Sequence, residues 1–510
     1  MNKENDRLSL TGSELRPEDV REVAFGRQAV TISPQALAAM EASHQLVASI
    51  VSSGKPTYGI STGFGDLSRL TISEDMNAQL QLNLIRSHAS GVGPAFSSEV
   101  VRAIMLLRLN ALCVGYSGVN PKVAWLLADL INHDIIPRIP QQGSLGASGD
   151  LANLAHMSLV LVGEGEALVD GQWLEGGQAL ARWGLSPVSL AGKDGLALIN
   201  GTSVMLGLGV LGLLEAELCM DAANKAAALT FEALRGFRDA YDPGVHLLRR
   251  QEGQIQVAAL LLEALEGSEW ADSRQEDVQD AYTLRCVPQV HGASMDALAY
   301  VRQIISREIN AVTDNPLVFA DRGLVISGGN FHGQPLALAL DFLAIAVAEL
   351  ANISERRTER MVNPQLSNGL PAFLCQNGGV QSGFMIPQYV AASLVSENKV
   401  LAHPASVDSI PSSANKEDHV SMGAFAARKA REVVANTERV IAIELLCAAQ
   451  ALDLMGKRQL GRGTSKVYSL IRQHIPPMTE DRPPSRDIEE IAGLIRSGAI
   501  MACSDQAGVL

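Results

Sequence analysis

A long run of apolar and small residues at helical spacing constrains the fold most strongly. Between Met422 and Met455 such residues recur every three or four positions, at 422, 426, 430, 433, 437, 440/441, 445, 448, 452 and 455. With a rise of about 1.5 Å per residue, a helix of this length extends on the order of 50 Å. A compact domain would not cover it, so the pattern predicts a long helical bundle.

Two further segments, Leu336–Met361 and Val390–Leu401, have the pattern of companion helices. In the first 200 residues, helical segments alternate with glycine-rich loops, and Asp170-Gly171 between two short apolar runs predicts a hairpin over 167–174. We therefore expect a mainly α fold. A mixed N-terminal region, 1–200, precedes a long up-down bundle with C-terminal helices, 201–510, and the boundary is approximate.

Composition excludes several classes of protein. Hydrophobic residues make up 47% and charged residues 19%, which argues against disorder, and a net charge of −14 argues against a nucleic-acid partner. The most apolar stretch, Leu336–Leu350, carries Asp341 and Glu349 and is too short and charged to span a membrane. The N-terminus has no apolar signal segment, and the six cysteines form no CxxC pair. We expect a cytoplasmic protein.

Common cofactor motifs are weak or missing. Gly207-Leu-Gly209-Val-Leu-Gly212 fits GxGxxG, but it lies in an apolar helical run without a surrounding βαβ unit, so we expect helix–helix packing there. His332, His403 and His419 lack metal-ligand spacing. Neither a nucleotide nor a metal is expected.

The segment Gly143-Ser-Leu-Gly-Ala147-Ser148-Gly149-Asp150 is the most informative one. One interpretation is a glycine-rich turn that leads into a helix, with Ser148 or Asp150 as N-cap. In the other, the Gly149 nitrogen attacks the Ala147 carbonyl carbon, and loss of two waters leaves a 4-methylidene-imidazol-5-one (MIO) group. Glycine at 149 lets the backbone fold tightly enough for this attack.

Gly-Ala-Ser-Gly-Asp-Leu resembles the MIO-forming signature of the aromatic amino-acid ammonia-lyases, and the resemblance covers nearly the whole chain. Their remaining active-site blocks are similar to Tyr58-Gly-Ile-Ser-Thr-Gly-Phe-Gly65, Leu198-Ile-Asn200-Gly-Thr202, Gln279-Asp-Ala-Tyr282-Thr-Leu-Arg285-Cys286, Thr313-Asp-Asn315-Pro316 and Gly328-Gly-Asn-Phe331-His332-Gly. Several such blocks in the same order make the resemblance specific.

The resemblance implies a role for each block, and each residue also has a plainer structural explanation. Catalytic roles fall to Ala147, Ser148 and Gly149 as the source of the MIO group, to Tyr58 as base for the β-proton, to Tyr282 in proton handling and to Asn200 as a donor to the MIO ring. Arg285 would hold the substrate carboxylate beside Asn315 and Gln279, and Phe331 would pack near the ring. Without the resemblance, these would be a loop aromatic, an interface tyrosine, an ion-paired arginine and a core phenylalanine. A phenol titrates near ~10, so Tyr58 needs local positive potential to act as a base.

Two positions indicate family members that act on histidine and release urocanate. Ser87-His88 stands where phenylalanine and tyrosine lyases carry other pairs, and Glu417 stands where phenylalanine lyases have glutamine. The side chains of His88 and Glu417 can both hydrogen-bond an imidazole ring. Three residues depart from the family pattern: Lys416 stands where glutamine is usual, Ser61 replaces an asparagine, and Asn153 replaces a proline that would fix the first turn of a helix. These departures leave a modified histidine or another aromatic amino acid open as substrate.

The resemblance further implies a homotetramer whose active sites draw residues from more than one chain. Two rival hypotheses remain. A lyase of the fumarase/aspartase type would need a GSSxMPxKxN-like loop, which the sequence lacks. A catalytically silent homologue would keep the bundle without cyclising its loop.

Overall fold

The computed structural model describes residues 7–63, 65, 69–274 and 277–503. The chain divides into two compact units: unit 1 comprises Met1–Leu211, Gln303–Asp341 and Pro404–Arg428, and unit 2 comprises Gly212–Arg302, Phe342–His403 and Lys429–Leu510. The first break lies near the boundary expected around residue 200. The chain then returns to unit 1 twice, which the sequence did not indicate.

Unit 1 contains short helices and four small sheets. Its elements are β1 (Leu8–Leu10), α1 (Pro17–Ala24), β2 (Val30–Ile32), α2 (Pro34–Ser53), α3 (Glu74–His88), β3 (Val92–Ala95), α4 (Ser98–Cys113), α5 (Pro121–Asn132), β4 (Ile136–Pro137), β5 (Pro140–Gln142), α6 (Leu151–Leu161), β6 (Glu166–Val169), β7 (Gln172–Glu175), α7 (Gly176–Ala181), α8 (Asp194–Ile199), β8 (Leu317–Phe319) and β9 (Leu324–Ile326). The described residues of unit 1 also include the short 3-10 helices Ala320–Arg322 and Ser413–Asn415.

Helix α4 forms the centre of unit 1. Each of its residues from Val100 to Cys113 is buried, so this part of the helix has no solvent face. The buried polar side chains on it, Arg108 and Asn110 among them, hydrogen-bond to backbone carbonyl oxygens. Helices α1, α2 and α5 pack around it. The sheets are β1–β2 (parallel) and β3–β5, β4–β6–β7 and β8–β9 (antiparallel), so the described strands brace loops instead of forming a continuous layer.

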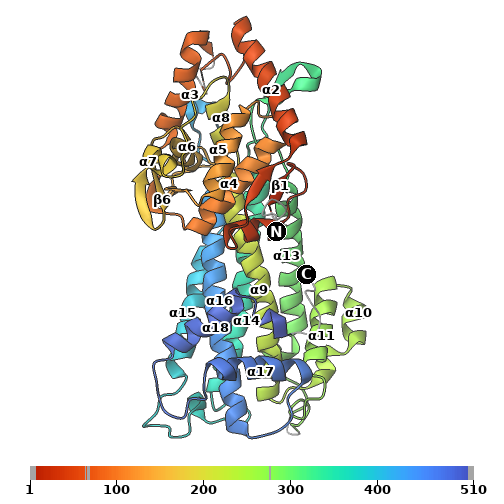
Figure 1. The fold of residues 1–510 in the computed structure, drawn as a ribbon. Coiled ribbons are helices and arrows are strands. Elements are labelled where there is room, and N and C mark those ends of the chain that lie inside the picture. Colours follow the sequence, from red (N-terminus) through yellow and green to blue (C-terminus); the bar gives the residue numbers. More distant parts are fainter. Residues whose placement is uncertain (1–6, 64, 66–68, 275–276, 504–510) are drawn as a thin grey trace. The chain divides into compact units, whose positions relative to one another are not determined.

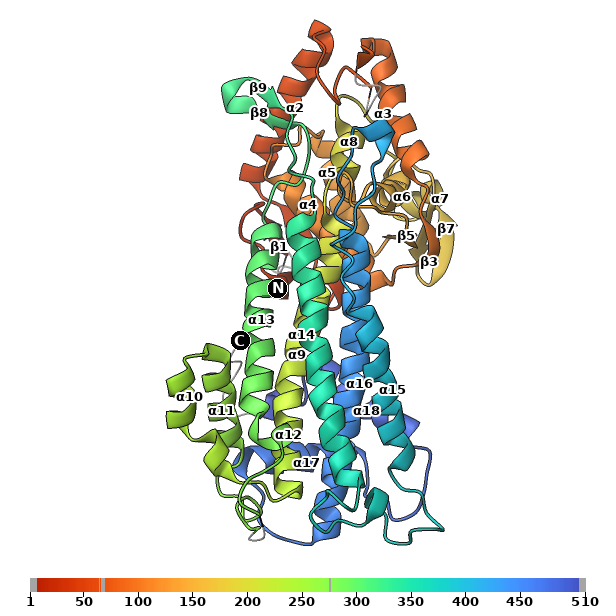
Figure 2. The same cartoon turned by 180° about the vertical axis from the view of Figure 1, so that it is seen from behind.

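Unit 2 is built on long helices. Parts of α9 (Ser203–Ala233), α13 (Val287–Glu308), α14 (Gln334–Val362) and α16 (Gly423–Met455) lie side by side in it, together with α15 (Met385–Leu401) (Figures 1 and 2). Its remaining helices are α10 (Pro243–Arg249), α11 (Glu252–Ala264), α12 (Tyr282–Arg285), α17 (Arg462–His474), α18 (Ser485–Arg496) and the 3-10 helices Arg238–Tyr241, Ala372–Leu374 and Met501–Cys503.

A buried polar layer ties these four long helices together, and we call it the bundle layer. It comprises Asn224 and Thr230 on α9, His291 on α13, Arg357 on α14 and Glu444 on α16. Arg357 Nη2 donates to Glu444 Oε2 at 2.8 Å, and Thr230 Oγ1 donates to Glu444 Oε1 at 2.8 Å. His291 Nδ1 lies 2.8 Å from Asn224 Oδ1, and Arg357 Nη1 lies 3.4 Å from His291 Nε2. Burial and the neighbouring guanidinium hold the pKa of His291 well below its ordinary value, so its ring is neutral.

The helices and the hairpin expected from the sequence are confirmed. Helix α16 begins one residue after the predicted segment and ends at Met455, whereas α15 begins five residues before the predicted start at Val390. The hairpin is β6–β7, with Asp170 and Gly171 at positive φ of 49° and 78°. A Cβ at Gly207 would lie 3.1 Å from the Ile104 side chain, which confirms close helix packing at that glycine.

Two described helices, α9 and α14, are long and apolar enough to cross a membrane. The expectation that the stretch beginning at Leu336 is too short was therefore wrong about length, because α14 continues to Val362. The most apolar window of α9 is 94% buried within the protein and that of α14 is 67% buried. Helices of a large core meet the same length and apolarity criteria, because their side chains face other helices on most sides.

Candidate active site

The Ala-Ser-Gly segment lies in a tight loop of unit 1 between β5 and α6. Gly149 has a φ of +70°, and a Cβ at this position would stand 2.2 Å from the Gly201 carbonyl oxygen. The two glycines form a β-bridge, and the Asp150 amide donates to the Gly201 oxygen at 2.8 Å. Only glycine fits at 149, because a side chain would meet backbone on the opposite strand.

The carboxylate of Asp150 fixes the end of this loop. Asp150 is fully buried, and its Oδ2 accepts from the backbone amides of Val204 and Met205, at 3.0 and 2.9 Å, in the first turn of α9. Its Oδ1 accepts from Ser144 Oγ at 3.0 Å. Burial raises the pKa of Asp150 to about 6 despite these bonds. The loop is thus anchored to a helix N-terminus, where a carboxylate is favoured.

Asn200 is held beside the loop, but the orientation of its amide differs from the expectation. Its Nδ2 donates to the Asn315 carbonyl oxygen at 2.8 Å and lies 3.4 Å from Asp314 Oδ1. Its Oδ1 is buried and has no hydrogen-bond partner among the described residues. The Asn200 Nδ2 group, which was expected to donate to an MIO ring, therefore donates to a backbone carbonyl oxygen instead. Asn315 Oδ1 in turn accepts from the Gly328 amide at 2.7 Å.

Two buried basic side chains support the segments that carry Asn200 and Asn315, and sequence reasoning did not single them out. Lys193 Nζ and Asp314 Oδ2 form an ion pair of 2.6 Å in which neither side chain is exposed. Arg108 Nη1 donates to the carbonyl oxygens of Asn200 and Thr313, at 3.3 and 3.0 Å, while its Nε and Nη2 have no partner among the described residues. We call Lys193, Asp314, Arg108 and Asn200 the loop network.

A cavity of about 260 Å³ in unit 1 joins the loop to two predicted ring-binding residues. It is lined by Ser87, His88, Ser90, Gly143, Ser144, Leu145, Ala147, Gly149, Leu151, Ala152, Ser412, Ser413 and Glu417. His88 and Glu417 are 329 positions apart in the chain (417 − 88), and the fold brings both to the cavity that contains Ala147 and Gly149. This cavity is the candidate active site.

His88 ends helix α3 and contacts its neighbour Ser87. Ser87 Oγ lies 3.1 Å from the Leu84 carbonyl oxygen and 3.1 Å from His88 Nδ1, so it holds the imidazole against the end of the helix. Burial lowers the pKa of His88, which keeps the ring neutral.

Glu417 follows a strained turn. Ser413, Ala414 and Asn415 have φ values of 49°, 52° and 64°, a left-handed conformation that costs on the order of 1–3 kcal/mol for each such residue. The Ser412 and Glu417 backbones pair across the turn, and Ser412 Oγ lies 3.3 Å from Glu417 Oε2. Lys416 and Glu417 therefore follow a turn and do not belong to a helix.

Tyr58 and Phe331 lie on loops of unit 1. The Gly65 amide lies 3.5 Å from the Tyr58 hydroxyl, and Phe64 of the same block is outside the described residues. Burial, and to a lesser extent the Glu417 carboxylate, raise the pKa of Tyr58, so the positive potential expected around this phenol is not what its surroundings supply. Ser61 closes the same loop by donating to the Lys55 carbonyl oxygen at 2.6 Å. Phe331 is half-buried.

The remaining predicted residues belong to unit 2 and contact one another. Arg285 Nη1 donates to Gln279 Oε1 at 2.7 Å, and its guanidinium lies 4.6 Å from the centre of the Tyr282 ring. Tyr282 is 69% exposed. The structure thus places the three as one group on and beside α12, with Gln279 and Tyr282 exposed and Arg285 half-buried.

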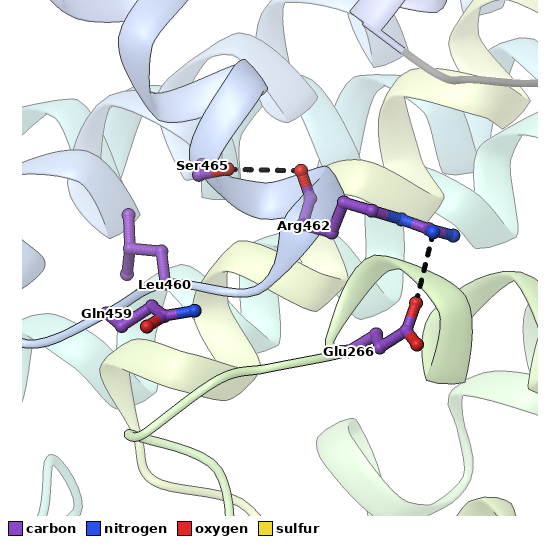
Figure 3. Close-up of a pocket in the computed structure, with 5 residues that line it drawn as sticks. All are labelled: Glu266, Gln459, Leu460, Arg462 and Ser465. Carbon is purple, nitrogen blue, oxygen red and sulfur yellow. Dashed lines mark hydrogen bonds and ion pairs between the residues drawn. The ribbon is translucent and has the colours of Figure 1, made fainter.

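A second cavity, of about 500 Å³, lies in unit 2 between the α11–α12 connection and the start of α17 (Figure 3). Its lining residues are Glu266, Gln459, Leu460, Arg462 and Ser465. Arg462 faces it but pairs with Glu266 at 3.2 Å, and Ser465 donates to the Arg462 carbonyl oxygen at 3.0 Å. These polar groups satisfy one another. Within the described ranges, no group of three His, Cys, Asp or Glu side chains could hold a metal ion.

The subunit is mainly helical, and one cavity brings His88 and Glu417 beside an Ala-Ser-Gly loop that pairs with Gly201. This combination defines a class of carbon–nitrogen lyase. The sequence model described as "Aromatic amino acid lyase" matches residues 15–473. The chain is 60% identical to a histidine ammonia-lyase of Treponema denticola over 488 residues, which is 96% of each chain. It therefore belongs to the aromatic amino acid lyase family.

Solved structures agree with this assignment. A histidine ammonia-lyase from Trypanosoma cruzi superposes with a TM-score of 0.91 at 44% identity, over 98% of this chain and 94% of that one. A tyrosine aminomutase from Streptomyces globisporus superposes with a TM-score of 0.94 at 38% identity, over 98% and 99%. The same fold thus occurs in enzymes named for different amino acids, so the substrate must be argued from the cavity.

Proposed function

We propose that this enzyme eliminates ammonia from L-histidine to give trans-urocanate, using an MIO group formed from Ala147, Ser148 and Gly149. One observation carries the proposal: His88 and Glu417 line the same cavity as Ala147 and Gly149. The cavity then contains both the source of an electrophile and two polar groups suited to an imidazole ring.

Formation of the group needs no outside reagent. The Gly149 nitrogen bonds to the Ala147 carbonyl carbon, and that carbonyl oxygen leaves as water with the amide protons of Gly149 and Ser148. The Ser148 hydroxyl leaves as a second water with its Cα proton, which creates the exocyclic double bond. The residues present fit this ring, because the backbone of Gly201 fills the space that a side chain at 149 would need. Once formed, the group supplies the electrophile that makes the substrate amine a better leaving group.

The ring of the substrate is recognised by two polar side chains. The Glu417 carboxylate only accepts and suits a ring N–H, and His88 can hydrogen-bond the other ring nitrogen. A phenyl ring would leave both of these half-buried side chains without a partner. Such a mismatch can reduce kcat/KM by as much as about 10⁴-fold.

Proton removal and carboxylate binding complete the proposal. Tyr58 takes the β-proton; because burial raises its pKa, it needs a cationic substrate nearby to stabilise the phenolate. Arg285 binds the substrate carboxylate by a two-pronged hydrogen bond, with Gln279 and Asn315 as polar support. Tyr282 assists proton transfer, and Phe331 packs against the ring.

In a homotetramer with shared active sites, the residues that line the cavity of unit 1 would meet the group on and beside α12 of another subunit. The exposed side chains of Gln279 and Tyr282 in unit 2, with the half-buried Arg285 beside them, are available to a neighbouring copy. Unit 2 also exposes large apolar side chains: Tyr300, Phe342 and Ile345 on α13 and α14, and Ile386, Tyr389, Val390 and Val400 on α15. Surfaces of this kind support association between subunits. We place the enzyme in the cytoplasm, with a small amino acid as its ligand and no nucleic acid or membrane.

Two measurements test the proposal together. Intact mass should be two waters lower than the encoded chain, and a panel of amino acids should give a conjugated acrylate fastest from histidine. Equal turnover of phenylalanine, or preference for a ring-modified histidine, would replace the substrate but keep the chemistry. A full mass with no turnover would leave a silent homologue.

A further inference from the structure

One side-chain bond closes the base of the loop that contains Ala147–Gly149. Asn153, in the first turn of α6, is fully buried, and its Nδ2 donates to the Pro140 carbonyl oxygen on β5 at 2.6 Å. Its Oδ1 is also buried and has no partner among the described residues. The amide therefore makes one short bond, and that bond joins the two ends of segment 140–153.

Both ends of this segment rest on regular structure. Pro140 pairs with Ala95 in the β3–β5 sheet, so its carbonyl is fixed by a strand. Asn153 is carried by α6, and Asp150 just before that helix is anchored to the start of α9. Inside the segment, Ser144 Oγ lies 3.0 Å from Asp150 Oδ1 and 3.5 Å from the Gly149 oxygen. The Asn153 bond is the outermost of these ties.

We propose that Asn153 is a positioning residue for formation of the MIO group. Nucleophilic attack of the Gly149 nitrogen on the Ala147 carbon requires a compressed loop, and a loop whose ends are already joined has fewer conformations to lose. The inference rests on the proposed function, because it concerns the step in which Ala147–Gly149 cyclises. The family pattern has a proline at position 153, and proline has no side-chain donor that could make this bond.

The loss of water can be timed in the full-length chain. The chain is made by cell-free translation at low temperature, translation is stopped, and intact mass is followed against time. Asn153→Leu removes the donor at similar volume, and Asn153→Ala removes it without a bulky replacement. Asn110→Leu is the matched control: Asn110 is also buried, donates to a carbonyl (Ile309, 2.9 Å) and has an unpartnered Oδ1, but lies on α4.

The two Asn153 variants should lose their waters about tenfold more slowly than the wild type, the factor that one net hydrogen bond of this kind supplies. Asn110→Leu should cyclise at the wild-type rate even though its thermal stability falls. Turnover per MIO-containing chain and KM for histidine should be unchanged in all three, because Asn153 acts before catalysis.

Cyclisation at the wild-type rate in whichever Asn153 variant folds would overturn the inference and leave the proposed function intact. An equal delay in Asn110→Leu would overturn it too, because general destabilisation would then explain the effect. A wild-type chain that keeps its full mass would overturn both the inference and the proposed function.

Discussion

Two buried polar clusters of this chain differ in how completely their polar atoms are hydrogen-bonded. In the bundle layer of unit 2, both carboxylate oxygens of Glu444, both ring nitrogens of His291 and all three guanidinium nitrogens of Arg357 have partners. In the loop network of unit 1, Arg108 Nε and Nη2 and Asn200 Oδ1 are buried without partners among the described residues. Each unpartnered buried group costs on the order of 1–3 kcal/mol.

The difference indicates what each cluster is for. Full pairing fixes the register of four long helices, since any shift along a helix axis would break several bonds at once. The unpartnered groups lie next to the Ala-Ser-Gly loop, and the left-handed residues directly precede Glu417. Both features reduce the stability of the fold, and both occur at the candidate active site. The predictions below test this contrast, from the largest expected effect to the smallest.

Ser148→Ala should abolish turnover and leave stability unchanged, because the methylidene carbon comes from the serine side chain. Release of the conjugated acrylate and the thermal unfolding midpoint report the two properties separately. Retained turnover would remove the MIO group from the mechanism, and a large fall in stability would contradict the distinction between the two clusters.

Glu417→Gln should reduce kcat/KM for histidine by roughly 10²–10⁴-fold, because the ring N–H loses its carboxylate acceptor. Turnover of phenylalanine, which offers no ring N–H, should change far less. Steady-state kinetics on both substrates decide the matter, and equal losses would exclude Glu417 from ring recognition.

Glu444→Gln should lower the free energy of unfolding by about 3–5 kcal/mol, because the buried Arg357 charge loses its counter-ion. Turnover per folded chain should stay the same. Glu489→Gln is the control: it breaks the more exposed pair with Arg439 and should cost less than about 1 kcal/mol. Similar losses in denaturant titrations of the two variants would contradict the role given to the bundle layer.

Asp150 should make the folded state less stable as the pH rises from about 4 to about 6. Its pKa is raised from 3.8 to about 6, so the folded state binds the proton more tightly than the unfolded state, and that advantage is lost once both are ionised. The shift corresponds to about 3 kcal/mol at most. Asp194, whose pKa is also raised to about 6, contributes to both proteins, so the stability of the wild type relative to Asp150→Asn should fall across this range. Parallel curves in denaturant titrations would exclude the contribution of Asp150.

Ser87→Ala should lower kcat/KM for histidine by about tenfold, because His88 Nδ1 loses the neighbouring hydroxyl that holds the ring in place. Ser90→Ala is the matched control, since Ser90 lines the same cavity and its hydroxyl lies 3.4 Å from the His88 carbonyl oxygen. If both variants lose activity equally, the contact between Ser87 and the His88 ring has no part in specificity.

Local pattern was enough to predict much of the fold. The spacing of apolar residues predicted α16 and α14, and Asp170-Gly171 predicted the hairpin, because each depends on contacts between near neighbours in sequence. The start of α15 was predicted five residues late, since Met385–Tyr389 has no strong apolar periodicity. The left-handed turn before Glu417 was not predicted, because the side chains of Ser413 and Ala414 do not favour that conformation.

The order of the motif blocks and the Ala-Ser-Gly tripeptide, both properties of the linear chain, by themselves determined the family and the candidate chemistry. Only the tertiary structure decided which atoms of these residues are free to act. It directs the Asn200 amide to the Asn315 backbone, raises the pKa of Tyr58 through burial, and lets Asn153 tie the loop to β5. Hydrogen-bond partners and desolvation depend on neighbours far away in sequence, and those neighbours are fixed only when the chain has folded.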